Sequence, residues 1–169
     1  TDGTAATATT YLTTVDVNNV EPSADCQQPQ LSADGSLVAF HSAATDLVVP
    51  SSGWLSGQHH VYSSLWNSEV PIVDLVSVGR GPNGVAISPD GSLGVVANFF
   101  GGTVTFFNPV TTGVIREVDV GGGPARVAFT PDGAGVWVSN YNDGTVTVID
   151  VETADVLGTI ATGAGVGAI

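Results

Sequence analysis

Few residues in this sequence have the types and spacing needed for acid–base, nucleophilic or metal chemistry. Histidine occurs only at His41, His59 and His60. Adjacent side chains on an extended chain point to opposite sides, so His59 and His60 make a poor chelating pair. His41 falls within an apolar strand pattern, and no G-x-S-x-G nucleophile motif is present. We therefore predict no catalytic residue, no metal ligand and no enzyme activity from these residues, although the activity stays open.

The carboxylates are numerous, and most have a structural explanation. Asp34, Asp90 and Asp132 each precede a glycine in a tight turn, where an aspartate bonds to its own backbone. A second group gathers in later turns, at Asp143, Asp150, Glu152 and Asp155. Such oxygens can hold Ca²⁺, but no D-x-D-x-D-G loop accompanies them. A solvated acidic surface is the favoured interpretation, and calcium stays open.

The glycine-rich stretch 121–124 resembles a phosphate loop only superficially. It lacks the Lys-Ser/Thr end and the helix that such a loop needs. Its counterpart at 79–82, Gly-Arg-Gly-Pro, indicates a link between two repeated units. We predict no cofactor.

Charge and composition exclude several classes of partner. The 169-residue chain has a net charge of −13, and its cations are Arg80, Arg116 and Arg126 alone. Three scattered arginines cannot form the basic stripe that nucleic acid or an anionic membrane surface requires. No apolar run is long enough for a membrane span, so no membrane insertion is expected. Acidity suits a soluble protein in a salty medium.

Cys26 is the only cysteine, so it forms no internal disulfide and no cysteine-based zinc site. A buried small apolar residue is the favoured interpretation, with an intermolecular bond as the alternative. The sequence opens at Thr1 without a charged and apolar leader, which fits a mature chain or an excised piece.

The strongest pattern is an internal repeat. Residues 81–121 align without a gap with residues 123–163, each matching the residue 42 positions further along. The first unit predicts four short strands, at 84–88, 93–98, 103–107 and 114–120. Valine and threonine fill them, turn residues separate them, and no helical period occurs. A repeated four-stranded unit of this length is typical of a β-propeller blade.

Several patches match in register between the two units: a Gly-Pro opening, VAISPDG with VAFTPDG, VVAN with VWVSN, and GTVTFF with GTVTVI. On these patches, 81–163 resembles the YVTN family of β-propeller repeats. Related propellers include lactone hydrolases and subunits of redox enzymes, so the resemblance permits an enzyme or a cofactor-binding propeller.

The first half contains a related unit. The stretch PQLSADGSLVAFHSAATDLV, followed by HHVYSS, resembles the WD40-like repeats (PD40 type) of TolB-type propellers. Asp34 and Asp90 are 56 positions apart, and the extra length predicts an insertion at 45–60 between the second and third strands. Residues 13–16 are expected to form an outer strand that precedes this blade.

We therefore expect one all-β domain of about three propeller blades. Blade 1 covers about 13–78, blade 2 about 79–121 and blade 3 about 122–163, with 164–169 beginning a fourth. A closed ring usually needs four or more blades, and open edges invite pairing with another chain. Either the chain is part of a longer propeller, or copies associate to cover its edges.

Propeller geometry places certain loops on one face, where a ligand or partner would bind. These loops join outer to inner strands and second to third strands. Exposed aromatic residues on such loops suggest contact with protein or carbohydrate. The predicted binding residues on this face are Trp54, Arg80, Asn83, Phe99, Phe100, Arg126, Tyr141, Asn142 and Asp143.

Two functions follow. The first is a secreted or cell-surface interaction protein, or a periplasmic one, that self-assembles through its blade edges into an oligomer or filament. Repeat architecture, missing catalytic motifs and threonine-rich termini support it. The second is a piece of a larger propeller enzyme or redox-enzyme subunit, lactonase-like or cofactor-binding.

Overall fold

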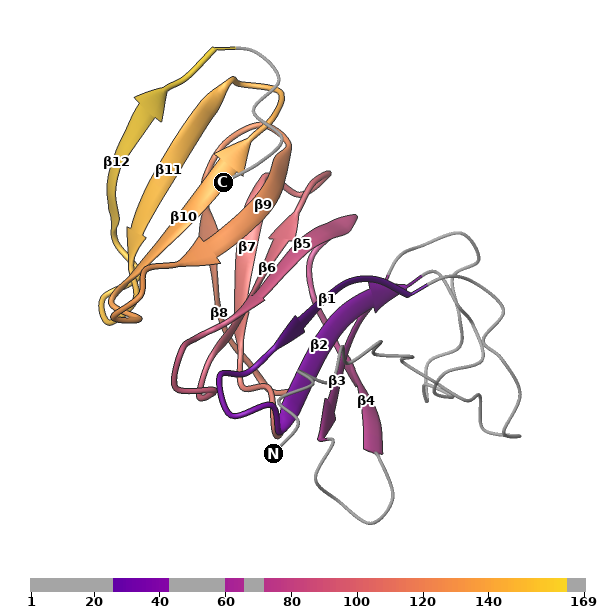
Figure 1. The fold of residues 1–169 in the computed structure, drawn as a ribbon. Coiled ribbons are helices and arrows are strands. Elements are labelled where there is room, and N and C mark those ends of the chain that lie inside the picture. The colour runs from indigo at the N-terminus through magenta and orange to yellow at the C-terminus, as the bar shows by residue number, and fades with distance from the viewer. Residues whose placement is uncertain (1–25, 43–59, 66–71, 164–169) are drawn as a thin grey trace, which may run out of the picture.

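The computed structural model describes residues 26–42, 60–65 and 72–163, and all regular structure in these segments is β-strand. The strands form four-stranded antiparallel sheets that fan out side by side (Figure 1). This confirms the predicted fold class, all-β with propeller blades. No helix long and apolar enough to cross a membrane is found in these segments.

Each sheet is a simple meander in which strands that follow each other in sequence are paired. Blade 1 contains β1 (Cys26–Leu31), β2 (Leu37–Ser42), β3 (His60–Leu65) and β4 (Ile72–Val76). Blade 2 contains β5 (Pro82–Ile87), β6 (Gly94–Asn98), β7 (Thr103–Phe107) and β8 (Val114–Asp119). Blade 3 contains β9 (Pro124–Phe129), β10 (Gly135–Asn140), β11 (Thr145–Asp150) and β12 (Val156–Ala161).

The observed strands of blade 2 begin and end within two residues of those predicted. The largest difference is the first strand, which begins at Pro82 because Pro82 pairs with Asn98 across a bulge that precedes Val85. The insertion predicted at 45–60 lies outside the described residues except for His60, which is already the first residue of β3. The strand predicted at 13–16 and the blade start at 164–169 lie outside the described residues.

The same tight turn joins the first two strands of every blade. In blade 2, the Gly91 N–H donates to the Ser88 carbonyl oxygen at 2.9 Å, and Ser88 Oγ donates to Asp90 Oδ1 at 2.6 Å. Residues 32–35 and 130–133 repeat both bonds. The glycine has a φ of 70–74° in all three turns, which explains why glycine occupies this position. The turns predicted from the repeated Asp-Gly pairs are therefore equivalent in space.

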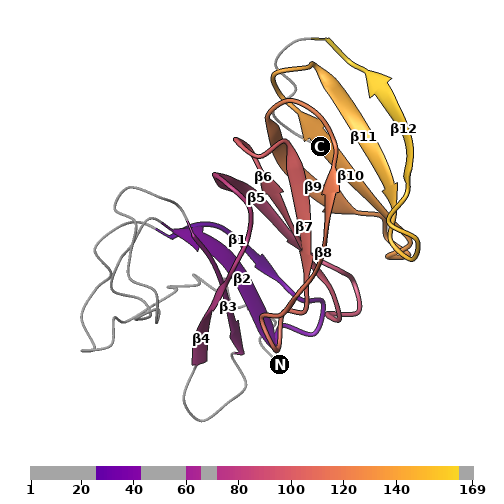
Figure 2. The same ribbon diagram turned by 180° about the vertical axis from the view of Figure 1, so that it is seen from behind.

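Neighbouring blades lie side by side, as the view from behind in Figure 2 also shows, and bury apolar side chains between them. Between blades 2 and 3, a single apolar cluster contains Ala86, Val95, Ala97, Val104, Phe106, Val127, Val136, Val138 and Ile149. Between blades 1 and 2, a second cluster contains Ala39, Val61, Val76, Val85, Val96 and Phe107. Blade 2 is thus buried on both faces, and Val95 and Val96 on β6 point into different clusters.

A glycine allows the innermost strands of blades 2 and 3 to approach closely. A Cβ atom on Gly84 would lie 2.7 Å from the Ala125 carbonyl oxygen and 2.9 Å from the Arg126 Cα atom. Both are backbone atoms, which cannot rotate out of the way. Any side chain at position 84 would therefore push β5 and β9 apart.

We expect Gly84→Ala to lower the free energy of unfolding by about 1–3 kcal/mol, the usual cost of overpacking. Gly158→Ala on β12 is the matched control, because a Cβ atom there would meet nothing within 4 Å. Urea unfolding followed by circular dichroism measures both variants. Equal stability of the two variants would contradict this close contact between the blades.

Candidate functional site

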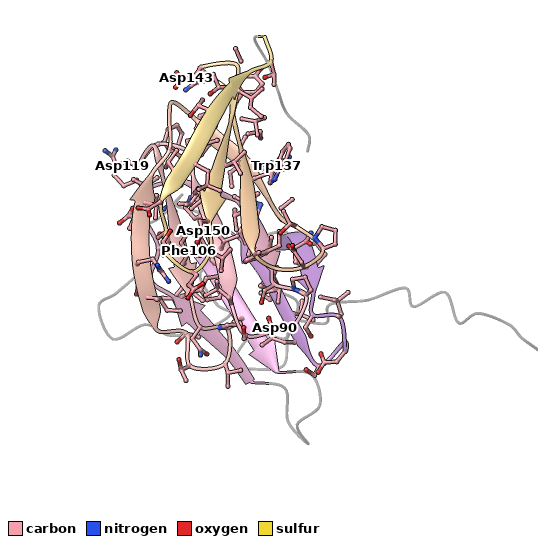
Figure 3. All side chains as sticks on the ribbon, turned by 90° about the vertical axis from the view of Figure 1, so that its left-hand side faces the viewer. Asp90, Phe106, Asp119, Trp137, Asp143 and Asp150 are labelled. Atoms are coloured by element: carbon pink, nitrogen blue, oxygen red, sulfur yellow. The ribbon has the colours of Figure 1, made fainter. Side chains whose placement is uncertain are left out.

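The loops predicted to bind a partner lie together at one end of the sheets. In blade 2, the N–H groups of Phe99 and Phe100 donate to the carbonyl oxygens of Gly81 and Arg80, at 2.8 and 3.1 Å. In blade 3, the N–H groups of residues 141 and 142 bond in the same way to residues 123 and 122. Backbone hydrogen bonds therefore fix each of these loops against the link that begins its own blade. Asp143 lies at this end of the fan, and Asp90 lies toward the other (Figure 3).

Aromatic side chains project from this loop face. The rings of Phe99 and Phe100 meet edge to face with centroids 5.3 Å apart. Phe100 lies over the backbone of Gly81, yet 73% of its surface is exposed. Tyr141 occupies the equivalent position to Phe99 on the next blade and is 48% exposed. Two adjacent blades thus present accessible rings from equivalent loops.

Buried asparagines hold these loops from below. Asn140 Nδ2 donates to the hydroxyls of Thr145 and Thr147, at 3.1 and 2.8 Å, and Thr147 Oγ1 in turn donates to the Val120 carbonyl oxygen. Because the Thr147 proton is committed to Val120, the amide orientation is fixed. Asn98 bonds in the same way to two threonines of blade 2. The repeat showed that these asparagines match, but their role as loop supports was not predicted.

A carboxylate accompanies each buried asparagine, from a different element in each blade. In blade 2 it is Glu117 on the outer strand, which accepts a hydrogen bond from Thr103 Oγ1. In blade 3 it is Asp143 on the loop, whose Oδ2 accepts the Gly122 N–H at 2.6 Å. The backbone supplies the donor for Asp143, so its position on the loop face is fixed.

Two predicted binding residues belong to strands and bridge neighbouring blades. Asn83 lies on β5 and Arg126 on β9, near the ends that adjoin the loop face. Arg126 Nη1 donates to Asn83 Oδ1 at 3.1 Å and to the Ala125 carbonyl oxygen at 2.9 Å. The guanidinium group therefore ties the innermost strands together. Arg80 is exposed on the loop face, and Trp54 lies outside the described residues.

Among the described residues, the remaining candidate metal ligands are held apart in separate elements. Asp150 accepts the Thr153 N–H at 2.8 Å within a turn, which explains one member of the predicted acidic group. His41 is buried on β2, and His59 lies outside the described residues. Within the described segments, no group of three His, Cys, Asp or Glu side chains lies close enough to hold a metal ion. Cys26 begins β1.

A groove that sequence reasoning missed runs along the innermost strands. Its volume is about 650 Å³, and β1, β5, β9 and the Asp-Gly turns that follow them line it. Polar and apolar surface line it in nearly equal parts. Val85, Ile87 and Phe129 contribute apolar side chains, and Arg126 contributes a charged one. Strands from three repeats build it, so no local sequence pattern could indicate it. The hydroxyls of Ser88 and Thr130 in its lining donate to Asp90 and Asp132 of their own turns, so these hydroxyl groups serve the turns.

Comparisons with known proteins support the fold. No protein-family model and no curated protein sequence matches the chain, so the YVTN and TolB likenesses remain resemblances in sequence. Among solved structures, hydrazine synthase from Kuenenia stuttgartiensis is similar, with a TM-score of 0.65 and 21% sequence identity. The match covers 81% of this chain and 36% of that chain, so this chain spans about a third of its length. At this identity the likeness concerns the fold alone.

The Asp-Gly turns, which lie at the end of the sheets opposite the loop face, should make the free energy of unfolding depend on pH in the acid range. Hydrogen bonds from Ser88 and Ser92 hold the pKa of Asp90 at about 2, below its ordinary value of 3.8. Bonds from Ser32 and Ser36 do the same for Asp34, whose pKa is also about 2. The stabilisation is therefore complete above the ordinary value and is lost as the pH falls from about 3.8 towards 2.

We expect Asp90→Asn to lower the free energy of unfolding at neutral pH, because an amide accepts hydrogen bonds more weakly than a carboxylate. In this variant the free energy of unfolding should also fall less steeply as the pH decreases from about 3.8 towards 2. Urea midpoints measured at a series of pH values test this. Asp119→Asn on β8 is the control, because Asp119 lies outside any such turn. A pH profile for Asp90→Asn as steep as that of the unchanged chain would refute the role of the turn.

Proposed function

We propose that this chain is an interaction protein, built from propeller blades, that works outside the cytosol and binds partners through its loop face. The observation that carries the proposal is the pair of accessible aromatic residues, Phe100 and Tyr141, on equivalent loops of adjacent blades. Backbone bonds and buried asparagines hold these loops in place, so binding costs little conformational entropy. Preformed, exposed aromatic surface is typical of protein and carbohydrate recognition.

The polar residues around these rings favour a protein or a carbohydrate as the partner. Arg80, Asn142 and Asp143 are exposed beside the aromatic rings and offer both donors and acceptors. A net charge of −13 and the absence of lysine argue against nucleic acid. The same acidity supports a location in a salty extracellular, cell-surface or periplasmic medium. We propose that copies of the chain are among the partners and that they assemble through open blade surfaces.

The alternative is that the chain forms part of a larger propeller enzyme or redox-enzyme subunit. Its support is the likeness to hydrazine synthase, which reaches only 21% identity and concerns the fold. The groove along the innermost strands would be the place for a small molecule in such a protein. The loop aromatics favour the interaction protein, because an active site in the groove would not require them.

Replacing the exposed rings should weaken partner binding while leaving the fold intact. We expect the double variant Phe100→Ser with Tyr141→Ser to weaken binding at least about tenfold, because two stacking surfaces are lost. The probes are a carbohydrate array and a random-peptide display library, each screened with the labelled chain. Val110→Ser is the matched control, since Val110 is also exposed but lies on the loop between β7 and β8.

Failure of both screens to yield any ligand for the unchanged chain would contradict the proposed loop-face function. Ligands whose binding is reduced equally by Val110→Ser and by the double variant would place the binding site elsewhere.

A further inference from the structure

The loops of blades 2 and 3 on the loop face are joined into one surface by the link between the two blades. On one side of this link, the Val120 N–H donates to the Gly102 carbonyl oxygen of the blade 2 loop at 3.0 Å. On the other side, the Gly122 N–H donates to Asp143 Oδ2 of the blade 3 loop at 2.6 Å. Hydrogen bonds therefore fix the two loops relative to each other, so a ligand can contact both without rearranging either.

Equivalent positions in the two loops carry a planar group that rests against the link of its own blade. In blade 2 this group is the Phe100 ring, which occupies the space that a Cβ atom on Gly81 would need. In blade 3 it is the Asn142 amide, which occupies the corresponding space at Gly123. Both side chains are exposed to solvent. A planar group that rests on backbone is placed to stack against a flat ligand, and it does not project far enough to enter a deep pocket of a partner protein.

Charge on these loops is balanced, unlike charge on the chain as a whole. The links and loops of blades 2 and 3 on this face are residues 79–81, 99–102, 120–123 and 141–144. Their charged side chains are one cation, Arg80, and one carboxylate, Asp143, which sum to zero, whereas the chain has a net charge of −13. A charged polymer is held by a surface of the opposite sign, which these loops lack. They are suited to an uncharged ligand.

The apolar area on these loops suits a small ligand better than a protein. Since Phe100 is 73% exposed and Tyr141 is 48% exposed, the two rings together offer on the order of 250 Å² for burial. A stable protein–protein interface needs about 800 Å² per partner, with an apolar core. Two rings among polar groups fall well short of that area, and they match the size of a few sugar units.

We propose that the loops of blades 2 and 3 bind an uncharged linear oligosaccharide. This inference rests on the proposed function and names carbohydrate as the class of partner for the same face. A sugar unit has an apolar C–H face, which stacks on the Phe100 ring, and a rim of hydroxyl groups that donate and accept hydrogen bonds. Hydroxyls of a neighbouring unit bond to the Asn142 amide and donate to the Asp143 carboxylate. That carboxylate has about four acceptor sites, and the Gly122 N–H occupies one of them.

The test is calorimetric titration of the purified chain with uncharged linear sugars: di- and hexasaccharides of β-linked glucose, xylose and N-acetylglucosamine, and of α-linked glucose. We expect a hexasaccharide to bind at least about tenfold more tightly than its disaccharide, because only the longer chain reaches both loops. Since the ligand is uncharged, its affinity should change less than about twofold between low and high salt. Polygalacturonate is the charged comparison, and we expect it to bind more weakly.

Two substitutions of Phe100 separate stacking from simple apolar contact. Phe100→Trp keeps a flat ring, so affinity for the hexasaccharide should stay within about threefold of the unchanged chain. Phe100→Leu keeps an apolar side chain without a ring, so affinity should fall about five- to tenfold. Both variants should fold normally, because Phe100 is largely exposed. Val110→Trp is the matched control, since it adds a ring on the loop between β7 and β8, and it should leave binding unchanged.

Three results would overturn this inference: no binding of any uncharged hexasaccharide, tighter binding of polygalacturonate, or equal affinity in Phe100→Leu and the unchanged chain. The proposed function fails separately. Peptide ligands from the display library whose binding is lost in the double variant Phe100→Ser with Tyr141→Ser, together with no oligosaccharide binding, would overturn the inference and leave the loop face as a protein-binding surface.

Discussion

A four-stranded sheet that is apolar on both faces is stable only between two neighbours, and this packing constraint governs the whole chain. All five residues of β6 are buried, and successive side chains enter the cores on either side of blade 2. The close approach at Gly84 and the glycine turns at one end both serve to bring equivalent sheets into contact. The repeat in the sequence is therefore the signature of a repeated contact, because each unit must match the next.

The same constraint also determines what many polar side chains do in the described segments. Polar side chains in the described segments are largely engaged in holding elements together: Asp90 in its turn, Asn98 and Asn140 beneath the loops, and Arg126 across two inner strands. Such groups already have hydrogen-bond partners, so using them for catalysis would weaken the fold. Among the residues that the structure describes, Phe100 and Tyr141 on the loops at one end of the sheets remain accessible.

The sequence predicted the parts of the structure that depend on neighbouring residues. The Asp-Gly turns and the strand pattern of blades 2 and 3 are local, and a gapless repeat doubles the evidence for each of them. The groove was not predictable, because β1, β5 and β9 come from three separate repeats. The pairing of Arg126 with Asn83 likewise depends on how two sheets are offset. Asn98 and Asn140 were visible as matched residues, but only the structure shows which threonines they bond.

The difference between blades 2 and 3 shows how the same supporting contact can be supplied by different elements. In blades 2 and 3, a buried asparagine lies beside a carboxylate below the loop, and a Cβ atom on Gly79 would touch both Asn98 and Glu117. At the equivalent Gly121, the atom would touch Asn140 and Asp143 instead. The carboxylate has thus moved from the outer strand to the loop, because position 159 is a threonine and position 101 a glycine. With that role transferred to Asp143, β12 no longer needs a charged residue there. The repeat therefore preserves the approach of a carboxylate to the buried asparagine, and not the position in the sequence that supplies the carboxylate.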